Sequence, residues 1–166
     1  MTAIQRVMIV GYGVMGQGVG KTFLNAGFDV TFKSARAGAL AAANPTLKFV
    51  DAWPKHAPDL IIEFVPEDVA TKRAVYMGAD AAYPGSKTLI ASGTSGMDLV
   101  ELVKGMKHPE RFIGLHYFMP ADTSAVVEVM AGHAAPREAV DRAAAACERT
   151  GKYALRLYRP DRKSVV

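Results

Sequence analysis

The sequence predicts an α/β protein with a doubly wound, mostly parallel β-sheet. Two observations predict this class: short β-branched runs alternate with longer alanine-rich helical stretches, and no repeat or low-complexity segment interrupts the alternation. With 166 residues, half of them hydrophobic, the chain can bury a core without metal or disulfide staples. We expect one domain over residues 1–166, without an internal linker.

The expected strands are short apolar runs that a sheet would bury. They cover residues 6–10, 30–33, 60–64, 88–91, 112–116, 125–130 and 153–158. The expected helices cover residues 15–26, 68–80, 97–106 and 136–150. Turn clusters such as residues 83–86 and 107–110 separate them. Each helix thus connects two strands, as in βαβ units.

The first of these turns reads Gly11-Tyr12-Gly13-Val14-Met15-Gly16 and lies between a strand and a helix. In a Rossmann-type fold the first glycine allows the tight turn, the second lets a pyrophosphate approach the backbone, and the third permits close helix packing. The helix N-terminus then faces the anion. We therefore predict a dinucleotide site here, the alternative being a glycine-rich turn without a ligand.

The end of the second strand indicates which dinucleotide binds. NAD-specific proteins usually carry Asp or Glu there for the ribose hydroxyls, but residues 31–36 contain no carboxylate. A hydroxyl at Ser34 and a guanidinium at Arg36 suit a ribose 2′-phosphate. We expect NADP in preference to NAD. The alternative is an exposed, solvated loop.

Further motifs follow in order along the chain. They are Glu67-Asp68-Val69-Ala70-Thr71-Lys72, Ser92-Gly93-Thr94-Ser95, the RFIGLHYFMP segment at residues 111–120, and Val127-Glu128-Val129. With the glycine turn, they resemble the NAD-binding domain of 3-hydroxyacyl-CoA dehydrogenases over nearly the whole chain. The resemblance implies that Ser95, His116 and Glu128 form the reaction centre. It also implies that Glu67 and Lys72 contact the cofactor.

Residue chemistry supports these roles independently. Oxidation of a secondary alcohol needs a base for the hydroxyl proton, and histidine suits that task. Glu128 shares a strand face with Val126 and Met130, so its carboxylate needs a partner, which His116 could provide. Ser95 would then hydrogen-bond the substrate oxygen.

Each of these residues also has a structural interpretation. Ser95, with Asp98 three residues on, resembles a helix capping box. Glu67 follows Pro66 at a helix start, where a carboxylate complements the helix dipole. A histidine such as His116 on an apolar strand is often a satisfied core residue.

The sequence also departs from the family pattern. Gly93 and Met119 stand where the family carries asparagine, and the region between Gly27 and Asp59 lacks the room for the family's coenzyme A hairpin. We expect the family's C-terminal helical substrate and dimer domain to be absent. We therefore expect little turnover from this chain alone.

Our main hypothesis is an NAD(P)-dependent dehydrogenase of the 3-hydroxyacyl-CoA type, acting on a 3-hydroxy acid or its CoA thioester. One alternative is an NADP-dependent dehydrogenase of small 3-hydroxy acids or prephenate-like acids. Another is a catalytically silent NADP(H)-binding module. Because the missing domain would leave Tyr117, Phe118 and Met119 near solvent, we expect a homo-oligomer.

Composition excludes other classes of function. The net charge of +4 comes from residues 149–166, which carry six basic side chains and one carboxylate, without a nucleic-acid motif. We predict no nucleic-acid partner, no membrane segment and no metal site. The lack of a signal peptide and the single Cys147 fit a cytoplasmic protein.

Overall fold

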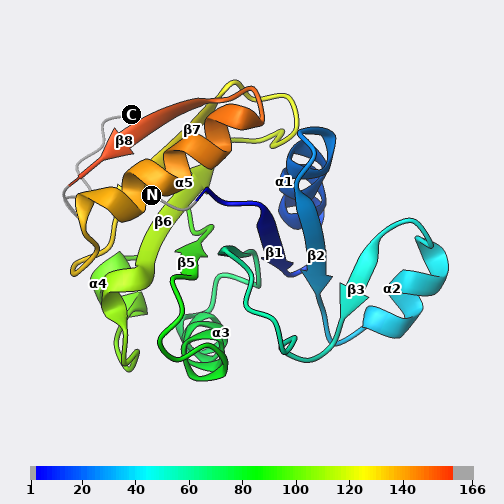
Figure 1. The fold of residues 1–166 in the computed structure, drawn as a ribbon, viewed down its shortest axis with the longest axis horizontal. Helices are drawn as coiled ribbons and strands as arrows, with labels where there is room; N and C mark the ends of the chain where they lie inside the picture. The colour runs from blue at the N-terminus through cyan, green and yellow to red at the C-terminus, as the bar shows by residue number, and fades with distance from the viewer. Residues whose placement is uncertain (1–2, 159–166) are drawn as a thin grey trace.

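The computed structural model describes residues 3–158 and contains one eight-stranded sheet flanked by helices (Figure 1). The strands are β1 (Arg6–Val10), β2 (Asp29–Lys33), β3 (Lys48–Val50), β4 (Leu60–Glu63), β5 (Leu89–Ser92), β6 (Phe112–Tyr117), β7 (Val126–Ala131) and β8 (Tyr153–Leu157). The helices are α1 (Val14–Asn25), α2 (Ala37–Ala43), α3 (Val69–Ala82), α4 (Leu99–Leu102) and α5 (Arg137–Arg149), with a 3₁₀ turn at Pro109–Arg111. The predicted fold class is confirmed.

The strand order is β3-β2-β1-β4-β5-β6-β7-β8, and every neighbouring pair is parallel except β6 and β7. The order reverses between β1 and β4, which is the point where open α/β sheets form a ligand crevice. The carboxyl ends of β1, β4, β5 and β6 meet at one edge of the sheet. The residues that follow these strands therefore come together.

Two apolar layers enclose the sheet. Helices α1 and α5 pack on one face through side chains such as Phe23 and Val140. Helices α3 and α4 pack on the other through side chains such as Tyr76 and Leu102. Successive β1 residues alternate between the two layers, so this strand is buried on both faces, which explains its unbroken apolar sequence.

The sequence analysis missed two elements and overestimated one. Helix α2 and strand β3 were not predicted, because both are too short to show a periodicity. Helix α4 spans Leu99–Leu102 instead of residues 97–106. The remaining predicted elements are present with bounds shifted by up to two residues. The predicted basic end falls partly on residues 159–166, which lie outside the described residues.

Candidate active site

A cavity of about 670 Å³ lies at the carboxyl ends of β1, β4, β5 and β6. It is lined by residues 11–13, Met15, Arg36, residues 64–67, Gly93, Ser95 and residues 116–119. It therefore brings together the glycine turn, Arg36, Glu67, Ser95 and His116, which the sequence placed far apart. Five other predicted site residues are not part of the lining: Val14, Gly16, Ser34, Lys72 and Glu128.

The glycine turn has the geometry that close approach to an anion requires. Gly11 has φ +100°, and a Cβ there would lie 2.7 Å from the carbonyl oxygen of Phe64. A Cβ at Gly16 would overlap the carbonyl oxygen of Gly11, so this glycine permits the tight turn. A Cβ at Gly13 would have no atom within 4 Å, so the backbone at Gly13 is open. Because Gly13 is also the N-cap of α1, the turn fits a dinucleotide pyrophosphate.

The end of β2 presents a cation to the cavity. Arg36 is exposed and lines it, whereas Ser34 is half-buried and its Oγ accepts the Arg36 N–H at 3.2 Å. Lys33 is directed elsewhere, because its ammonium donates to the Asp51 carbonyl at 2.7 Å and lies over the Trp53 ring. Arg36 is therefore the side chain of this turn that can reach a ligand in the cavity, and Ser34 shapes the turn.

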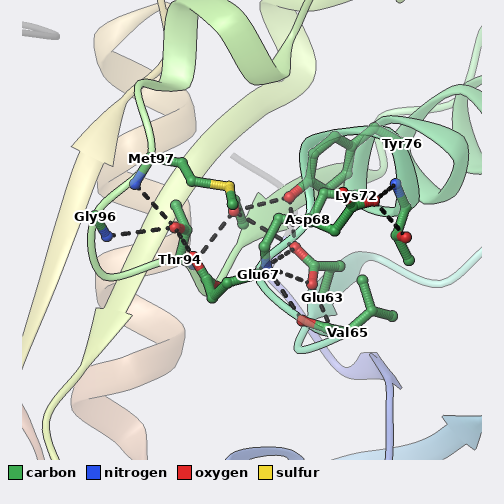
Figure 2. A network of polar contacts seen from close by, with 11 residues as sticks. Glu63, Val65, Glu67, Asp68, Lys72, Tyr76, Thr94, Gly96 and Met97 are labelled. Carbon is green, nitrogen blue, oxygen red and sulfur yellow. Dashed lines mark hydrogen bonds and ion pairs between the residues drawn. The ribbon is translucent and has the colours of Figure 1, made fainter.

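A buried polar network lies behind the cavity (Figure 2). The Glu63 carboxylate accepts hydrogen bonds from Lys72 Nζ at 2.8 and 3.0 Å, from Val65 N at 2.6 Å and from the Tyr76 hydroxyl. The Tyr76 hydroxyl also contacts Ser92 Oγ at 2.8 Å. Burial raises the pKa of Tyr76 far above its usual value, and the Glu63 charge adds to this effect, so the phenol remains a donor.

The network reaches the cavity through Glu67, whose side chain is 49% exposed. Its Oε1 pairs with Lys72 Nζ at 3.0 Å, and its Oε2 accepts the Thr94 hydroxyl at 2.6 Å. Sequence reasoning missed Glu63, Tyr76 and Thr94. The one available signal was a glutamate inside an otherwise apolar strand.

The structure replaces two structural interpretations of site residues. Thr94, not Ser95, makes the turn contacts, because its Oγ1 accepts the N–H groups of Gly96 and Met97. Asp98 is the N-cap of α4. Likewise Glu67 lies outside α3, whose N-cap is Asp68. Helix capping therefore does not account for Ser95 or Glu67.

Lys72 does not line the cavity. Its side chain is 1% exposed and is held by Glu63 and Glu67. Lys72 is therefore joined to the cavity through Glu67, which does line it.

His116 and Glu128 form a pair across the antiparallel β6 and β7 strands. They lie directly opposite in register, and His116 Nδ1 is 2.9 Å from Glu128 Oε2, so His116 is the partner that the sequence led us to expect for this carboxylate. Their side chains are 21% and 16% exposed, and the Phe118 ring lies 4.6 Å from the His116 ring. With Nδ1 directed at the carboxylate, Nε2 is the nitrogen left for a ligand in the cavity.

The segment after β6 is only partly exposed. Phe118 and Met119 are 40% and 69% exposed, as expected, but the expectation for Tyr117 is wrong. Its ring lies under α5, where the hydroxyl contacts Cys147 Sγ at 3.4 Å. This inward direction follows from the alternation of side chains along β6.

No cluster of three potential metal ligands occurs within residues 3–158. In the same part of the chain, none of the helices is long and apolar enough to cross a membrane.

Comparison with known proteins gives a consistent result. The family model for the 3-hydroxyacyl-CoA dehydrogenase NAD binding domain matches residues 6–55 and 54–159. A probable 3-hydroxybutyryl-CoA dehydrogenase of Bacillus subtilis is 27% identical over 179 residues, which cover 92% of this chain and 62% of that protein. The 3-hydroxyadipyl-CoA dehydrogenase of Escherichia coli is 29% identical over 187 residues, covering 95% of this chain and 38% of that protein.

Solved structures agree with this. The 3-hydroxybutyryl-CoA dehydrogenase of Escherichia coli superposes with a TM-score of 0.81 at 25% identity, over 93% of this chain and 38% of that one. A prephenate dehydrogenase from A. aeolicus reaches a TM-score of 0.73 at 16% identity over 96% of this chain and 61% of that one, and so shows the fold alone. The chain spans less than two thirds of each of these relatives. It belongs to the family of 3-hydroxyacyl-CoA dehydrogenases and corresponds to their NAD-binding domain.

Proposed function

We propose that the cavity binds a nicotinamide dinucleotide and that His116 acts there as the base for a 3-hydroxyacyl-CoA or a related 3-hydroxy acid. The observation that carries this proposal is the 2.9 Å contact between Glu128 and His116, because His116 lines the cavity together with the glycine turn. When bound, the nicotinamide accepts the hydride that leaves the carbinol carbon.

The side chains have complementary roles. His116 Nε2 takes the hydroxyl proton, while Glu128 holds the Nδ1–H and stabilises the imidazolium. Ser95 lines the same cavity and hydrogen-bonds the substrate oxygen. The test is oxidation of 3-hydroxybutyryl-CoA and of free 3-hydroxybutyrate with either cofactor. We expect weak turnover that His116→Ala abolishes and Glu128→Gln reduces. Oxidation that survives His116→Ala would overturn the assignment of the base.

Weak turnover is expected because Gly93 and Met119 replace two polar side chains of the family pattern. These two positions favour the catalytically silent NADP(H)-binding module as the second candidate. Cofactor binding without oxidation of either substrate would support that candidate.

We also propose that the cofactor is NADP(H) in preference to NAD(H). Arg36 lines the cavity, and no carboxylate follows β2 within residues 34–36. A charge-assisted contact to the 2′-phosphate contributes about 1.5–3 kcal/mol, which is roughly a tenfold to hundredfold difference in affinity. We expect calorimetry to show that Arg36→Ala weakens NADPH binding far more than NADH binding.

The matched control is Arg137→Ala, which removes the same charge from an exposed position on α5. It should leave both affinities unchanged. Equal affinities of the unaltered chain for NADPH and NADH would contradict the preference.

We further propose that the chain is a homo-oligomer that covers Phe118 and Met119, since both are exposed at the cavity mouth. Sedimentation that finds only monomer at high concentration would contradict this. We also propose a cytoplasmic location, which the unpaired Cys147 supports. Cell fractionation tests it.

A further inference from the structure

The cavity at the carboxyl ends of the strands has two chemically different parts. Its charged lining side chains, Arg36 and Glu67, follow β2 and β4. The part beside His116 is lined by residues that follow β5 and by residues 117–119, and none of these carries a charge. A group of the substrate that lies beside His116 therefore meets mostly apolar atoms.

Two features reduce the polarity of this part further. The Phe64 ring occupies the space that a side chain at position 93 would need. The Tyr117 hydroxyl is turned into the core under α5. Ser95 and His116 are then the lining residues of this part whose polar side-chain groups are available to the substrate. The proposed reaction directs both of these groups at one atom, the carbinol oxygen.

Phe118 and Met119 remain to contact a substituent on the carbinol carbon. The Phe118 ring centroid is 4.6 Å from that of His116, with the ring planes inclined at 51°. Phe118 and Met119 are 40% and 69% exposed, so a ligand that covers them removes apolar surface from water. Aromatic rings make favourable tilted or offset contacts with one another, and a thioether sulfur makes favourable contacts with a ring edge. These two side chains therefore favour an aromatic ring over an alkyl group.

We propose that the substrate carries an aromatic ring, such as a phenyl group, on the carbinol carbon, and that Phe118 and Met119 bind this ring. The inference rests on the proposed function and narrows its substrate class to 3-aryl-3-hydroxy acids or their thioesters. The balance of the reaction is unchanged. The carbinol hydrogen leaves as hydride to the oxidised nicotinamide, the hydroxyl proton passes to His116 Nε2, and the product is an aryl ketone.

Three acids that differ in one substituent test this: 3-hydroxy-3-phenylpropionate, 3-cyclohexyl-3-hydroxypropionate and 3-hydroxybutyrate. Oxidation of each with NAD⁺ or NADP⁺ gives kcat/KM, and the ratio between two acids is independent of how weak the turnover is. Calorimetry measures the affinity of the corresponding 3-oxo acids for the protein bound to NADH or NADPH, which needs no turnover. In both measurements the phenyl compound should exceed the methyl compound about thirtyfold and the cyclohexyl compound about fivefold.

Conservative variants locate the effect. Phe118→Leu and Met119→Leu keep an apolar side chain but remove the ring or the sulfur, so each should lower the phenyl-to-cyclohexyl ratio at least about twofold. Met77→Leu is the matched control, because Met77 is 43% exposed on α3 and does not line the cavity. It should leave the ratio unchanged. Circular dichroism verifies that each variant is folded.

The outcomes separate this inference from the proposed function. Equal values for the phenyl and methyl compounds would overturn it and would assign Phe118 and Met119 to the contact with a second copy of the chain. Equal values for the phenyl and cyclohexyl compounds would also overturn it, since apolar burial alone would then explain binding. If the protein binds a cofactor but none of the acids, this inference fails and the cofactor site stands. If it binds neither NADH nor NADPH, the cofactor site itself is wrong.

Discussion

The Phe64 ring occupies the space that a side chain at position 93 would need, so the effects of substituting Gly93 and Phe64 on stability should depend on each other. A Cβ at Gly93 would overlap the ring carbons Cε1 and Cδ1 of Phe64 and lie 2.7 Å from the carbonyl oxygen of Glu63. The ring can move, although it packs edge-on against Tyr117 at 6.2 Å. The carbonyl cannot move freely, because it accepts the Gly93 N–H at 2.9 Å between β4 and β5.

The magnitude follows from these two contacts. Overpacking a buried site costs about 1–3 kcal/mol, and we place Gly93→Ala at about 2–3 kcal/mol because one contact is to backbone. Phe64→Ala removes a half-buried ring and should cost about 1–2 kcal/mol. The double variant should be more stable than the sum predicts, by about 1–2 kcal/mol, since the ring overlap disappears while the carbonyl contact remains.

Urea unfolding, followed by Trp53 fluorescence and circular dichroism, measures these free energies. Gly96→Ala is the matched control, because a Cβ there would have no atom within 4 Å, and it should change stability by less than about 0.5 kcal/mol. Additive losses, or a Gly93→Ala protein as stable as the unaltered chain, would refute the reasoning. By the same geometry, asparagine at position 93, as in the family pattern, requires a smaller residue at position 64.

Three further predictions concern other parts of the molecule. Gly13→Ala should leave stability unchanged but weaken cofactor binding. Gly16→Ala should lower both stability and cofactor affinity, because the added Cβ would overlap the Gly11 carbonyl oxygen. Urea unfolding measures the stability, and calorimetry measures the affinity. Burial raises the pKa of Asp59, but N–H groups of Arg6 and Gln5 and the Arg6 guanidinium outweigh this and hold it below its usual value. A carboxylate whose pKa is lowered by folding stabilises the fold at a pH above its unfolded-state pKa, and this stabilisation is lost as the pH falls. Asp59→Asn should therefore lower the free energy of unfolding by about 1.5 kcal/mol at pH 7, as measured by urea unfolding. The difference should shrink below about pH 4. Burial raises the pKa of the Cys147 thiol to about 11, so a thiol reagent at pH 8 should label it only in urea; rapid labelling of the folded protein would contradict this.

The fold could be predicted from sequence because its main strands are buried on both faces and therefore appear as continuous apolar runs. Helix α2 and β3 escaped prediction because seven and three residues carry too little pattern. The position of β3 is set by pairing with β2, and α2 packs against β3; these are tertiary contacts that no local rule describes.

The candidate site also has parts that the sequence predicts and parts that it does not. The glycine turn and the His116–Glu128 pair were predictable because a motif or a strand register specifies them. The Glu63, Tyr76 and Thr94 contacts were not, since they depend on the packing of α3 against β4 and β5. The alternative interpretation of Ser95 as a capping residue was wrong by one position, because the hydroxyl of Thr94 makes the contacts that the capping pattern assigned to Ser95.

The antiparallel pairing of β6 with β7 determines when His116 and Glu128 separate as the protein unfolds locally. His116 and Glu128 are held by ladder hydrogen bonds instead of by a loop, so they should separate only when this part of the sheet opens. In native-state hydrogen exchange, the amides of both residues should exchange with the slow core, whereas those of residues 118–125 exchange early. The His116–Glu128 pair would then remain assembled through the local fluctuations that open the cavity mouth.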